Sequence, residues 1–219
     1  MARKGWHHRE YLPHCDGDGL IQHVVFRLAD SLPSQVMDRL SKAGDERSSE
    51  GVAAALDEGH GEALLGDTRF AEIVEAALIH FHEIRYTLIA WCVMPNHVHV
   101  VLRPLGQFAL GDIVKSWKSF TALQINRMLG RAGRLWAADY FDRFMRDDRQ
   151  LSATVAYVEA NPVAAGLCAA PDDWRFSSAW RERAEARAPS VAVVLTGRRR
   201  RRRPWGRSGS RHPTGRAGR

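Results

Sequence analysis

Apolar and polar positions alternate along the chain in two distinct periods. Continuous β-branched and aliphatic runs predict buried strands, whereas apolar residues that recur every three or four positions predict amphipathic helices. The predicted strands are residues 20–28, 86–93 and 97–102, with a further strand within 135–145. The predicted helices begin near residue 33 and span 67–82, 111–129 and 149–160.

The helical stripes identify the expected core residues. On helix 67–82 they are Phe70, Ile73, Val74, Ala77, Leu78 and Phe81, and on helix 111–129 they are Ile113, Trp117, Phe120 and Leu123 or Gln124. On the last helix they are Leu151, Val155 and Val158. Asp147 and Asp148 are expected to cap this helix. Pro162 is expected to end it, because proline disfavours helical geometry in the residue before it.

Composition indicates one domain and one unusual tail. The 219 residues allow a single domain of ordinary size, expected over 1–185. The formal net charge is +7, but ten of the 32 basic residues lie from Arg198 onward, which leaves 22 basic and 25 acidic side chains in residues 1–197, a net charge of −3. Residues 186–219 are therefore predicted to be a disordered arginine-rich tail that adds salt-sensitive affinity for polyanions.

Cysteine usage and hydropathy indicate the compartment. The three cysteines, Cys15, Cys92 and Cys168, are scattered and odd in number, which is typical of a reducing cytoplasm and argues against a disulfide framework. No run of 18 apolar residues exists that could span a membrane. The first residues are not followed by the apolar segment of a secretory signal. A cytoplasmic location is expected.

Two histidines interrupt the most apolar of the predicted strands. Side chains alternate across a strand, so His97 and His99 are expected to share one face. Two neutral imidazoles at this spacing can hold one divalent ion. The alternative is that both are ordinary histidines, hydrogen-bonded at the edge of a sheet. The preceding Pro95 and Asn96 predict a turn.

Tyr157 and Asn161 lie four residues apart on the last predicted helix, and this spacing places them on one helix face. Each also has a plain structural interpretation. Tyr157 could pack with its hydroxyl in water, and Asn161 could simply precede the proline that ends the helix.

Several motifs together resemble the single-tyrosine HUH transposases, and specifically the REP-associated tyrosine transposases. They run in the expected order over about residues 9–180: residues 9–14, 26–33, 94–100, 117–121, 139–143 and 157–167. His23 differs from the aromatic or apolar residue that is common in this family on the first strand. The resemblance implies an α+β, ferredoxin-like fold, an antiparallel sheet with helices packed on it.

The same resemblance implies a site and a reaction. His97, His99 and Asn161 would bind a divalent metal, Mg²⁺ or Mn²⁺, and Tyr157 would be the nucleophile. The expected activity is cleavage and rejoining of single-stranded hairpin DNA through a 5′-phosphotyrosyl intermediate. The expected partner is DNA, with hairpins formed by palindromic repeats as the substrate, and the protein would act as a monomer or homodimer.

Other residues are candidates for contacts with DNA. Lys115 and Lys118 lie off the apolar stripe of their helix, so they could meet phosphates or form a solvated face. Arg143, in one of the similar motifs, is a third candidate. Trp117, Trp136 and Tyr140 could stack on bases or pack in the core.

Two other functions remain open from the sequence. The first is a domesticated, non-catalytic DNA-binding protein that recognises palindromic repeats. The second is an unrelated metal hydrolase or cupin-like enzyme that uses the two histidines alone.

Overall fold

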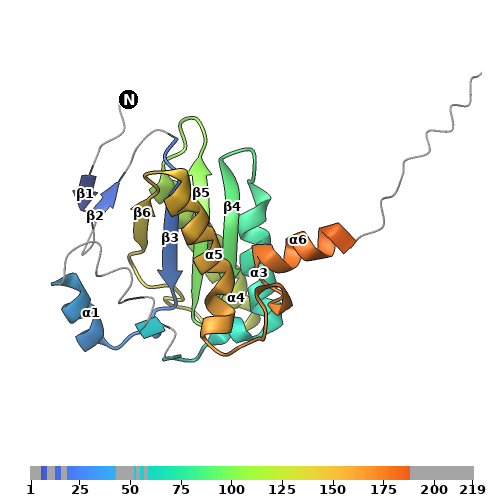
Figure 1. Ribbon diagram of the computed structural model, residues 1–219. Helices are drawn as coiled ribbons and strands as arrows, with labels where there is room; N and C mark the ends of the chain where they lie inside the picture. The colour runs from blue at the N-terminus through green and yellow to red at the C-terminus, as the bar shows by residue number, and fades with distance from the viewer. Residues whose placement is uncertain are drawn as a thin grey trace, which may run out of the picture. The chain divides into compact units, whose positions relative to one another are not determined.

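One four-stranded antiparallel sheet forms the centre of the fold (Figure 1). The computed structural model describes residues 6–8, 13–15, 19–42, 52, 55–56 and 59–187. The strand order is β4-β5-β3-β6, with bounds Tyr86–Val93, His97–Pro104, Gln22–Arg27 and Phe141–Phe144. Strand β5 therefore pairs on both sides, with β4 and with β3.

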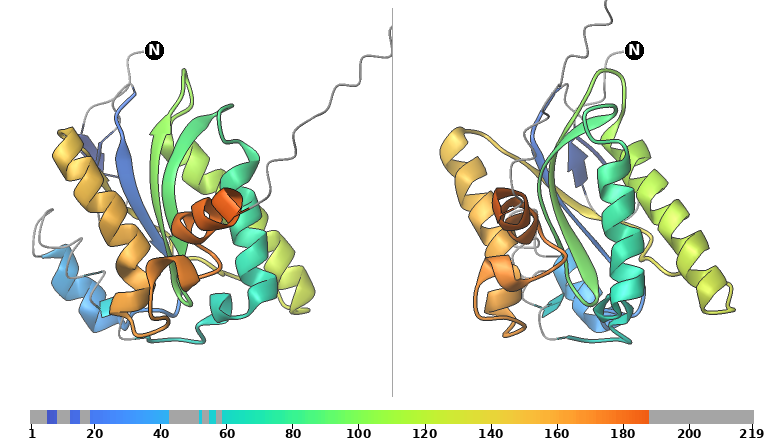
Figure 2. Two further views of the ribbon diagram at one scale, coloured as in Figure 1. Left: turned by 45° about the vertical axis from the view of Figure 1, so that its right-hand side comes forward. Right: turned by 90° about the vertical axis from the view of Figure 1, so that its right-hand side faces the viewer.

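Helices cover both faces of this sheet (Figure 2). One face carries α3 (Thr68–His80) and α4 (Leu110–Met128), and the other carries α5 (Asp148–Ala164) and α6 (Ser178–Arg187). The succession β3, α3, β4, β5, α4, β6 is the split βαβ arrangement of ferredoxin-like folds. The ferredoxin-like α+β fold expected from the resemblance is confirmed.

The remaining elements are short. They are β1 (Trp6–His8) and β2 (Pro13–Cys15), which form a two-stranded sheet, α1 (Ser34–Ser41), and the 3-10 helices η1 (Leu64–Gly66) and η2 (Pro171–Asp173). Strands β1 and β2 precede the first strand that the apolar pattern predicts, residues 20–28. Within the described residues, no helix is both long enough and apolar enough to cross a bilayer.

Most of the predicted arginine tail lies outside the described residues, because the description ends at residue 187. The predicted domain boundary near residue 185 and the predicted disorder of the tail therefore stay predictions.

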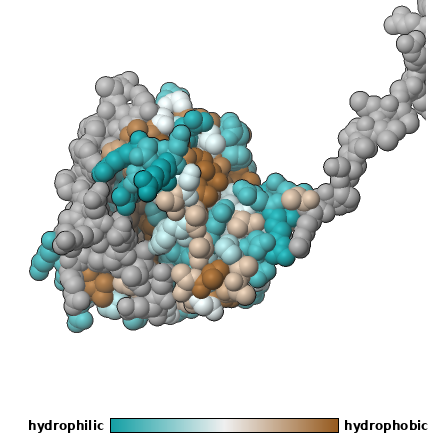
Figure 3. Space-filling model, viewed as in Figure 1, coloured by the Kyte–Doolittle hydropathy of each residue, from teal (hydrophilic) through white to brown (hydrophobic). Residues whose placement is uncertain are grey.

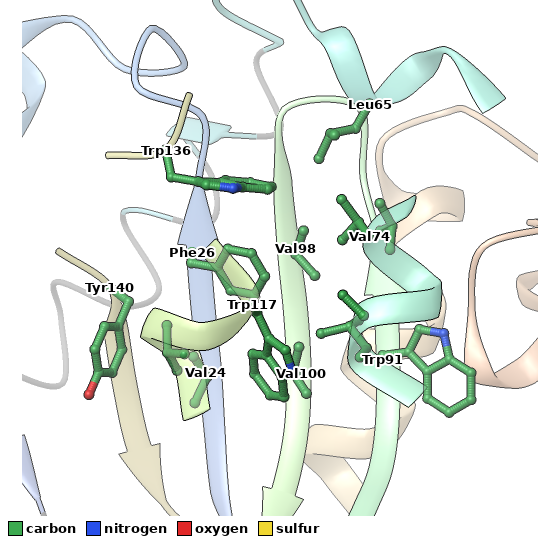
Figure 4. Close-up of a cluster of buried hydrophobic side chains, with 14 of the residues drawn as sticks. Val24, Phe26, Leu65, Val74, Trp91, Val98, Val100, Trp117, Trp136 and Tyr140 are labelled. Atoms are coloured by element: carbon green, nitrogen blue, oxygen red, sulfur yellow. The ribbon is translucent and has the colours of Figure 1, made fainter. Parts of the chain in front are cut away.

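Alternation along β5 gives the sheet two chemically different faces. Val98, Val100 and Leu102 point into the main core, where they meet side chains of α3 and α4 (Figure 4). Val101 points to the other face and packs with Val158 of α5. His97 and His99 have the same parity as Val101, so they lie under α5 as the alternation predicts.

A chain of hydrogen bonds crosses the main core. Trp136 Nε1 donates to Thr121 Oγ1 at 2.9 Å, and this hydroxyl donates to the Trp117 carbonyl at 2.7 Å. Trp117 Nε1 donates to the Tyr86 hydroxyl at 2.9 Å, which in turn donates to the Leu78 carbonyl at 2.8 Å. Every polar tip of these buried rings therefore has a partner.

This network corrects the predicted stripe of α4. Thr121 and Ile125 are buried, whereas Phe120 and Leu123 are 49% and 59% exposed. The sequence favoured the large apolar residues, but Thr121 satisfies its hydroxyl within the core and so can be buried there. Trp117, Trp136 and Tyr140 are also buried in this core (Figure 4), which leaves them packing residues instead of platforms for bases.

Helix α5 continues past its proline. Asp147 caps it as predicted, by accepting a hydrogen bond from the Gln150 amide at 2.7 Å. The helix does not end before Pro162 but runs to Ala164, and the Ala165 amide still donates to the Asn161 carbonyl at 3.0 Å. The preference against helix before proline is only statistical, and here the packing of Val158, Asn161 and Pro162 against the sheet overrides it. Asn161 is therefore inside the helix, and its side chain is buried.

Loss of one hydroxyl in the core should weaken the fold. Tyr86→Phe removes the acceptor for Trp117 Nε1 and leaves that buried N–H unpaired. The free energy of unfolding should fall by about 1–3 kcal/mol, measured by urea denaturation. The matched control is Tyr157→Phe, the same change at a tyrosine that is 43% exposed, which should alter stability by less than about 0.5 kcal/mol. Equal effects of the two substitutions would contradict this account of the network.

Candidate active site

A tight turn fixes the start of β5. The Met94 amide donates to the His97 carbonyl at 2.9 Å, which closes the two-residue turn at Pro95 and Asn96. Two neighbouring segments hold the turn in place, because the Leu28 amide donates to the Asn96 carbonyl and the Leu65 amide to the Pro95 carbonyl, both at 2.9 Å. The predicted turn is confirmed, and it is anchored on both sides.

The Asn96 side chain orients the first imidazole. Its Nδ2 donates to the carbonyls of Leu56 and His60, at 2.9 and 3.3 Å. Its Oδ1 therefore faces His97 Nδ1, at 2.7 Å, and accepts a hydrogen bond from it. With the proton on Nδ1, His97 Nε2 carries the free electron pair, as a metal ligand requires.

Three imidazoles follow one another in space. His97 Nε2 lies 2.8 Å from His99 Nε2, and His99 Nδ1 lies 3.1 Å from His23 Nε2. The His23 and His99 rings are nearly parallel, with centroids 5.3 Å apart and planes 11° apart. His97 and His99 are fully buried.

Burial keeps these rings neutral. Desolvation lowers the pKa of His97 to about 3, helped by the nearby His23. Desolvation likewise lowers the pKa of His99 well below its ordinary value, with His97 and His23 adding to the effect. The pKa of His23 is lowered to about 4 by desolvation and by the charge of Arg143. The unprotonated form is the one that coordinates metals.

Tyr157 of α5 lies over the same imidazoles. Its ring stands edge-on to His99, with centroids 5.7 Å apart and planes 87° apart, and edge-on to His23 at 6.2 Å. Tyr157 is 43% exposed, so the phenol is open to solvent on one side while its ring contacts the buried His99 and the partly buried His23. The hydrophilic side chains near the N-terminus of α5 show that this end of the helix is solvated (Figure 3).

Asn161 presents an unsatisfied amide. It is 1% exposed, and neither Oδ1 nor Nδ2 has a hydrogen-bond partner. A buried amide without partners is costly, on the order of 1–3 kcal/mol, and such groups call for an explanation such as an ion. An oxygen-binding cation at Oδ1 would supply that explanation.

Tyr157 contacts His99, and the directions of α5 and β5 indicate towards which end of the histidine pair Asn161 lies. The two elements run in opposite senses along the sheet (Figures 1 and 2). Four helical residues advance about 6 Å, close to the roughly 6.6 Å that two strand residues cover. One turn of α5 beyond Tyr157 therefore corresponds to the step along β5 from His99 to His97.

The structure also brings in a residue that the sequence did not single out as part of the site. His23 lies on β3 and pairs with Val101 of β5 and with Arg143 of β6. Directly paired residues point to the same face, so Arg143 lies on the α5 side with the histidines. Only the strand-pairing register shows that His23 lies on the same face as the histidines of β5, because His23 is far from β5 in the sequence.

The two lysine candidates lie elsewhere. Lys115 and Lys118 belong to α4, which covers the opposite face of the sheet. Lys118 Nζ donates to the Ala138 carbonyl at 2.8 Å. Neither lysine is brought to the histidines, and a role for them in DNA binding stays a prediction. Of the three basic candidates, the structure brings only Arg143 to the face that carries the site.

A comparison with protein families matches the part of the chain that contains these residues. Residues 67–161 match the family model described as "Transposase IS200 like". This part of the chain is similar to the IS200-like transposases. The IS200-like segment contains His97, His99, Tyr157 and Asn161, whereas β3 and its His23 lie before it.

Two individual proteins extend the comparison. The "Putative REP-associated tyrosine transposase" of Haemophilus influenzae is 24% identical over 107 residues, 44% of this chain. That match spans 61% of the length of the curated relative. A solved structure, a REP-associated tyrosine transposase bound to a REP hairpin, aligns with a TM-score of 0.54 at 18% identity. It covers 85% of this chain and 87% of its own, and it shows the shared fold. These matches confirm the resemblance that the sequence motifs indicated.

Acid should destabilise the metal-free protein. Histidine in an unfolded chain has a pKa of about 6.5, whereas His23 and His97 have pKa values of about 4 and about 3 in the fold. The unfolded state therefore binds more protons below about pH 6.5, and the free energy of unfolding falls as the pH drops. Between about pH 7 and pH 5 the loss should be on the order of 2 kcal/mol for each histidine.

Urea denaturation at about pH 7, 6 and 5 measures this loss. The variant His23→Phe removes one of the titrating rings, so its stability should fall less over the same range. A free energy of unfolding that stays constant over that range would contradict the expectation.

Proposed function

We propose that the protein is a metal-dependent, single-tyrosine transposase or endonuclease that cleaves and rejoins single-stranded hairpin DNA. The observation that carries the proposal is the position of the Tyr157 ring, 5.7 Å from the ring of His99 in the buried imidazole pair. A potential nucleophile thus lies beside a potential metal site. The IS200-like segment supports strand transfer as the reaction class.

The residues present fit a divalent ion, Mg²⁺ or Mn²⁺. His97 Nε2 and His99 Nε2 are neutral nitrogens 2.8 Å apart, and Asn161 Oδ1 is a buried oxygen without a partner. Among the described residues no group of three or more His, Cys, Asp or Glu side chains forms a metal site. The proposed set therefore depends on the amide as its third ligand. When bound, such an ion would neutralise negative charge that develops at the scissile phosphate.

Tyr157 supplies the nucleophile in this proposal. Its phenolic oxygen attacks the phosphorus of a phosphodiester, so that an O–P bond to tyrosine forms as the P–O3′ bond breaks. The phenolic proton passes to water, because the side chain is partly exposed. The departing 3′ oxygen takes a proton and becomes a free hydroxyl. The product is a 5′-phosphotyrosyl link.

The link conserves the energy of the broken bond. A 3′-hydroxyl from the same or another strand can attack the phosphotyrosine, which restores a phosphodiester and frees Tyr157. Cleavage and rejoining are thus one reaction run in two directions, and no nucleotide triphosphate is required.

DNA is the proposed partner. The solved neighbour holds a REP hairpin, and we extend that substrate class, hairpins of palindromic repeats, to this chain. Arg143 lies on the face of the sheet that carries the histidines and could contact a phosphate there. The arginine-rich end of the chain could add non-specific affinity that weakens as salt rises.

The decisive experiment is an assay for a covalent protein–DNA adduct. Labelled single-stranded hairpins from palindromic repeats beside the coding sequence are incubated with Mn²⁺ and resolved on denaturing gels. Wild type should form an SDS-stable adduct, and Tyr157→Phe should form at least about 1,000-fold less because it lacks the attacking oxygen. Tyr140→Phe, the same change in the opposite core, should retain the adduct. Normal adduct formation by Tyr157→Phe would remove Tyr157 from the reaction.

The same assay separates the proposal from a non-catalytic DNA-binding protein. Such a protein would bind the hairpins in a gel-shift experiment but would form no adduct with any variant, wild type included.

Metal binding can be tested independently of cleavage. His97→Ala and His99→Ala each remove a nitrogen ligand, so Mn²⁺ affinity measured by titration calorimetry should fall at least about tenfold. His80→Ala is the matched control, because His80 lies on the exposed side of α3. Unchanged Mn²⁺ binding in both site variants would refute the ligand assignment.

A further inference from the structure

A third histidine contacts both halves of the proposed site. His23 Nε2 lies 3.1 Å from His99 Nδ1, and the planes of the two rings are 11° apart. The His23 ring also meets Tyr157 edge-on, at 6.2 Å between centroids. It comes from β3, which the IS200-like match does not include.

The geometry argues against His23 as a ligand of the same ion. The two nitrogens proposed to hold the ion are His97 Nε2 and His99 Nε2, which approach each other at 2.8 Å. His23 instead approaches the other nitrogen of His99, on the far side of that imidazole. His97, His99 and His23 thus form a row and do not converge on a single point, in agreement with the absence of a cluster of three or more metal-binding side chains among the described residues.

We propose that His23 is a positioning residue that accepts a hydrogen bond from His99 Nδ1 and thereby directs His99 Nε2 to the metal. The inference rests on the proposed function, since it assumes a divalent ion at His97 and His99. Each metal-binding imidazole would then have its own orienting partner: Asn96 Oδ1 for His97, at 2.7 Å, and His23 Nε2 for His99.

The hydrogen bond has a definite direction when the ion is present. A ring that gives its Nε2 electron pair to a metal must carry its proton on Nδ1. His99 is then the donor, and His23 must offer an unprotonated Nε2, with its own proton on Nδ1. The two ring planes are only 11° apart, so the rings lie nearly coplanar and the hydrogen bond itself fixes the plane of His99.

Two substitutions separate hydrogen bonding from packing. His23→Phe keeps a ring of similar size but has no acceptor. His23→Gln loses the ring but offers an amide oxygen that can accept from His99 Nδ1. Mn²⁺ binding to the full-length protein, measured by titration calorimetry, should weaken about 10- to 100-fold in His23→Phe and less than about threefold in His23→Gln. His80→Phe on α3 serves as the matched control and should bind as wild type does.

Each result decides a separate point. If His23→Phe binds Mn²⁺ as tightly as wild type, or if His23→Gln is weakened as much as His23→Phe, the positioning role is wrong. If the wild-type protein itself binds no Mn²⁺, the metal assignment of the proposed function fails, and this inference falls with it. Calorimetry thus distinguishes the two failures.

A measurement on the wild-type protein covers the case in which a variant does not fold. Nitrogen-15 NMR of the imidazoles, with diamagnetic Mg²⁺ bound, reports which ring nitrogen of each histidine carries the proton. The proposal expects the proton of His99 on Nδ1 and that of His23 on Nδ1, with His23 Nε2 unprotonated. A proton on His23 Nε2 in the Mg²⁺-bound protein would overturn it.

Discussion

The pairing of β5 on both of its edges is the constraint on which the rest of the structure depends. Because the strand is central, its side chains have only two directions available, and successive residues must take opposite ones. Val98, Val100 and Leu102 fill the core beneath α3 and α4, and this burial commits His97 and His99 to the opposite face. A shift of one residue in register would place two imidazoles in the main core and move valines to the face under α5. The apolar core therefore positions the polar site.

Helix α5 completes that site through the same kind of constraint. Val158 packs against the sheet with Val101 and Cys92, and this contact sets the rotation of the helix. Tyr157 is then brought to the edge of the contact, where it meets His99 and remains partly exposed. Asn161 follows Val158 by three residues and is buried without a partner. The apolar residues of α5 thus stabilise the fold by packing on the sheet, and Tyr157, beside them, contacts His99.

Two features of the site keep the imidazoles neutral and hold their rings in a fixed direction. His97 and His99 are desolvated, which disfavours their charged forms, and each has a hydrogen-bonding neighbour at its Nδ1. Asn96 is itself held by the carbonyls of Leu56 and His60, so that the orientation of His97 depends on a segment far earlier in the chain. His23 has the equivalent place beside His99. A polar site in an apolar layer requires such partners, because unpaired polar groups there are destabilising.

The sequence by itself determined the elements and the residues that are close within them. The apolar period predicted α3, β4 and β5 nearly to their ends, and a spacing of two or four residues placed His97 with His99 and Tyr157 with Asn161. Only the tertiary structure decided what depends on contacts between elements. The register of β3 brought His23 to the site, packing on the sheet carried α5 past Pro162, and the layer order put Lys115 and Lys118 on the face away from the histidines. The reason is that local periodicity fixes which face of an element is apolar, whereas pairing and packing fix what that face meets.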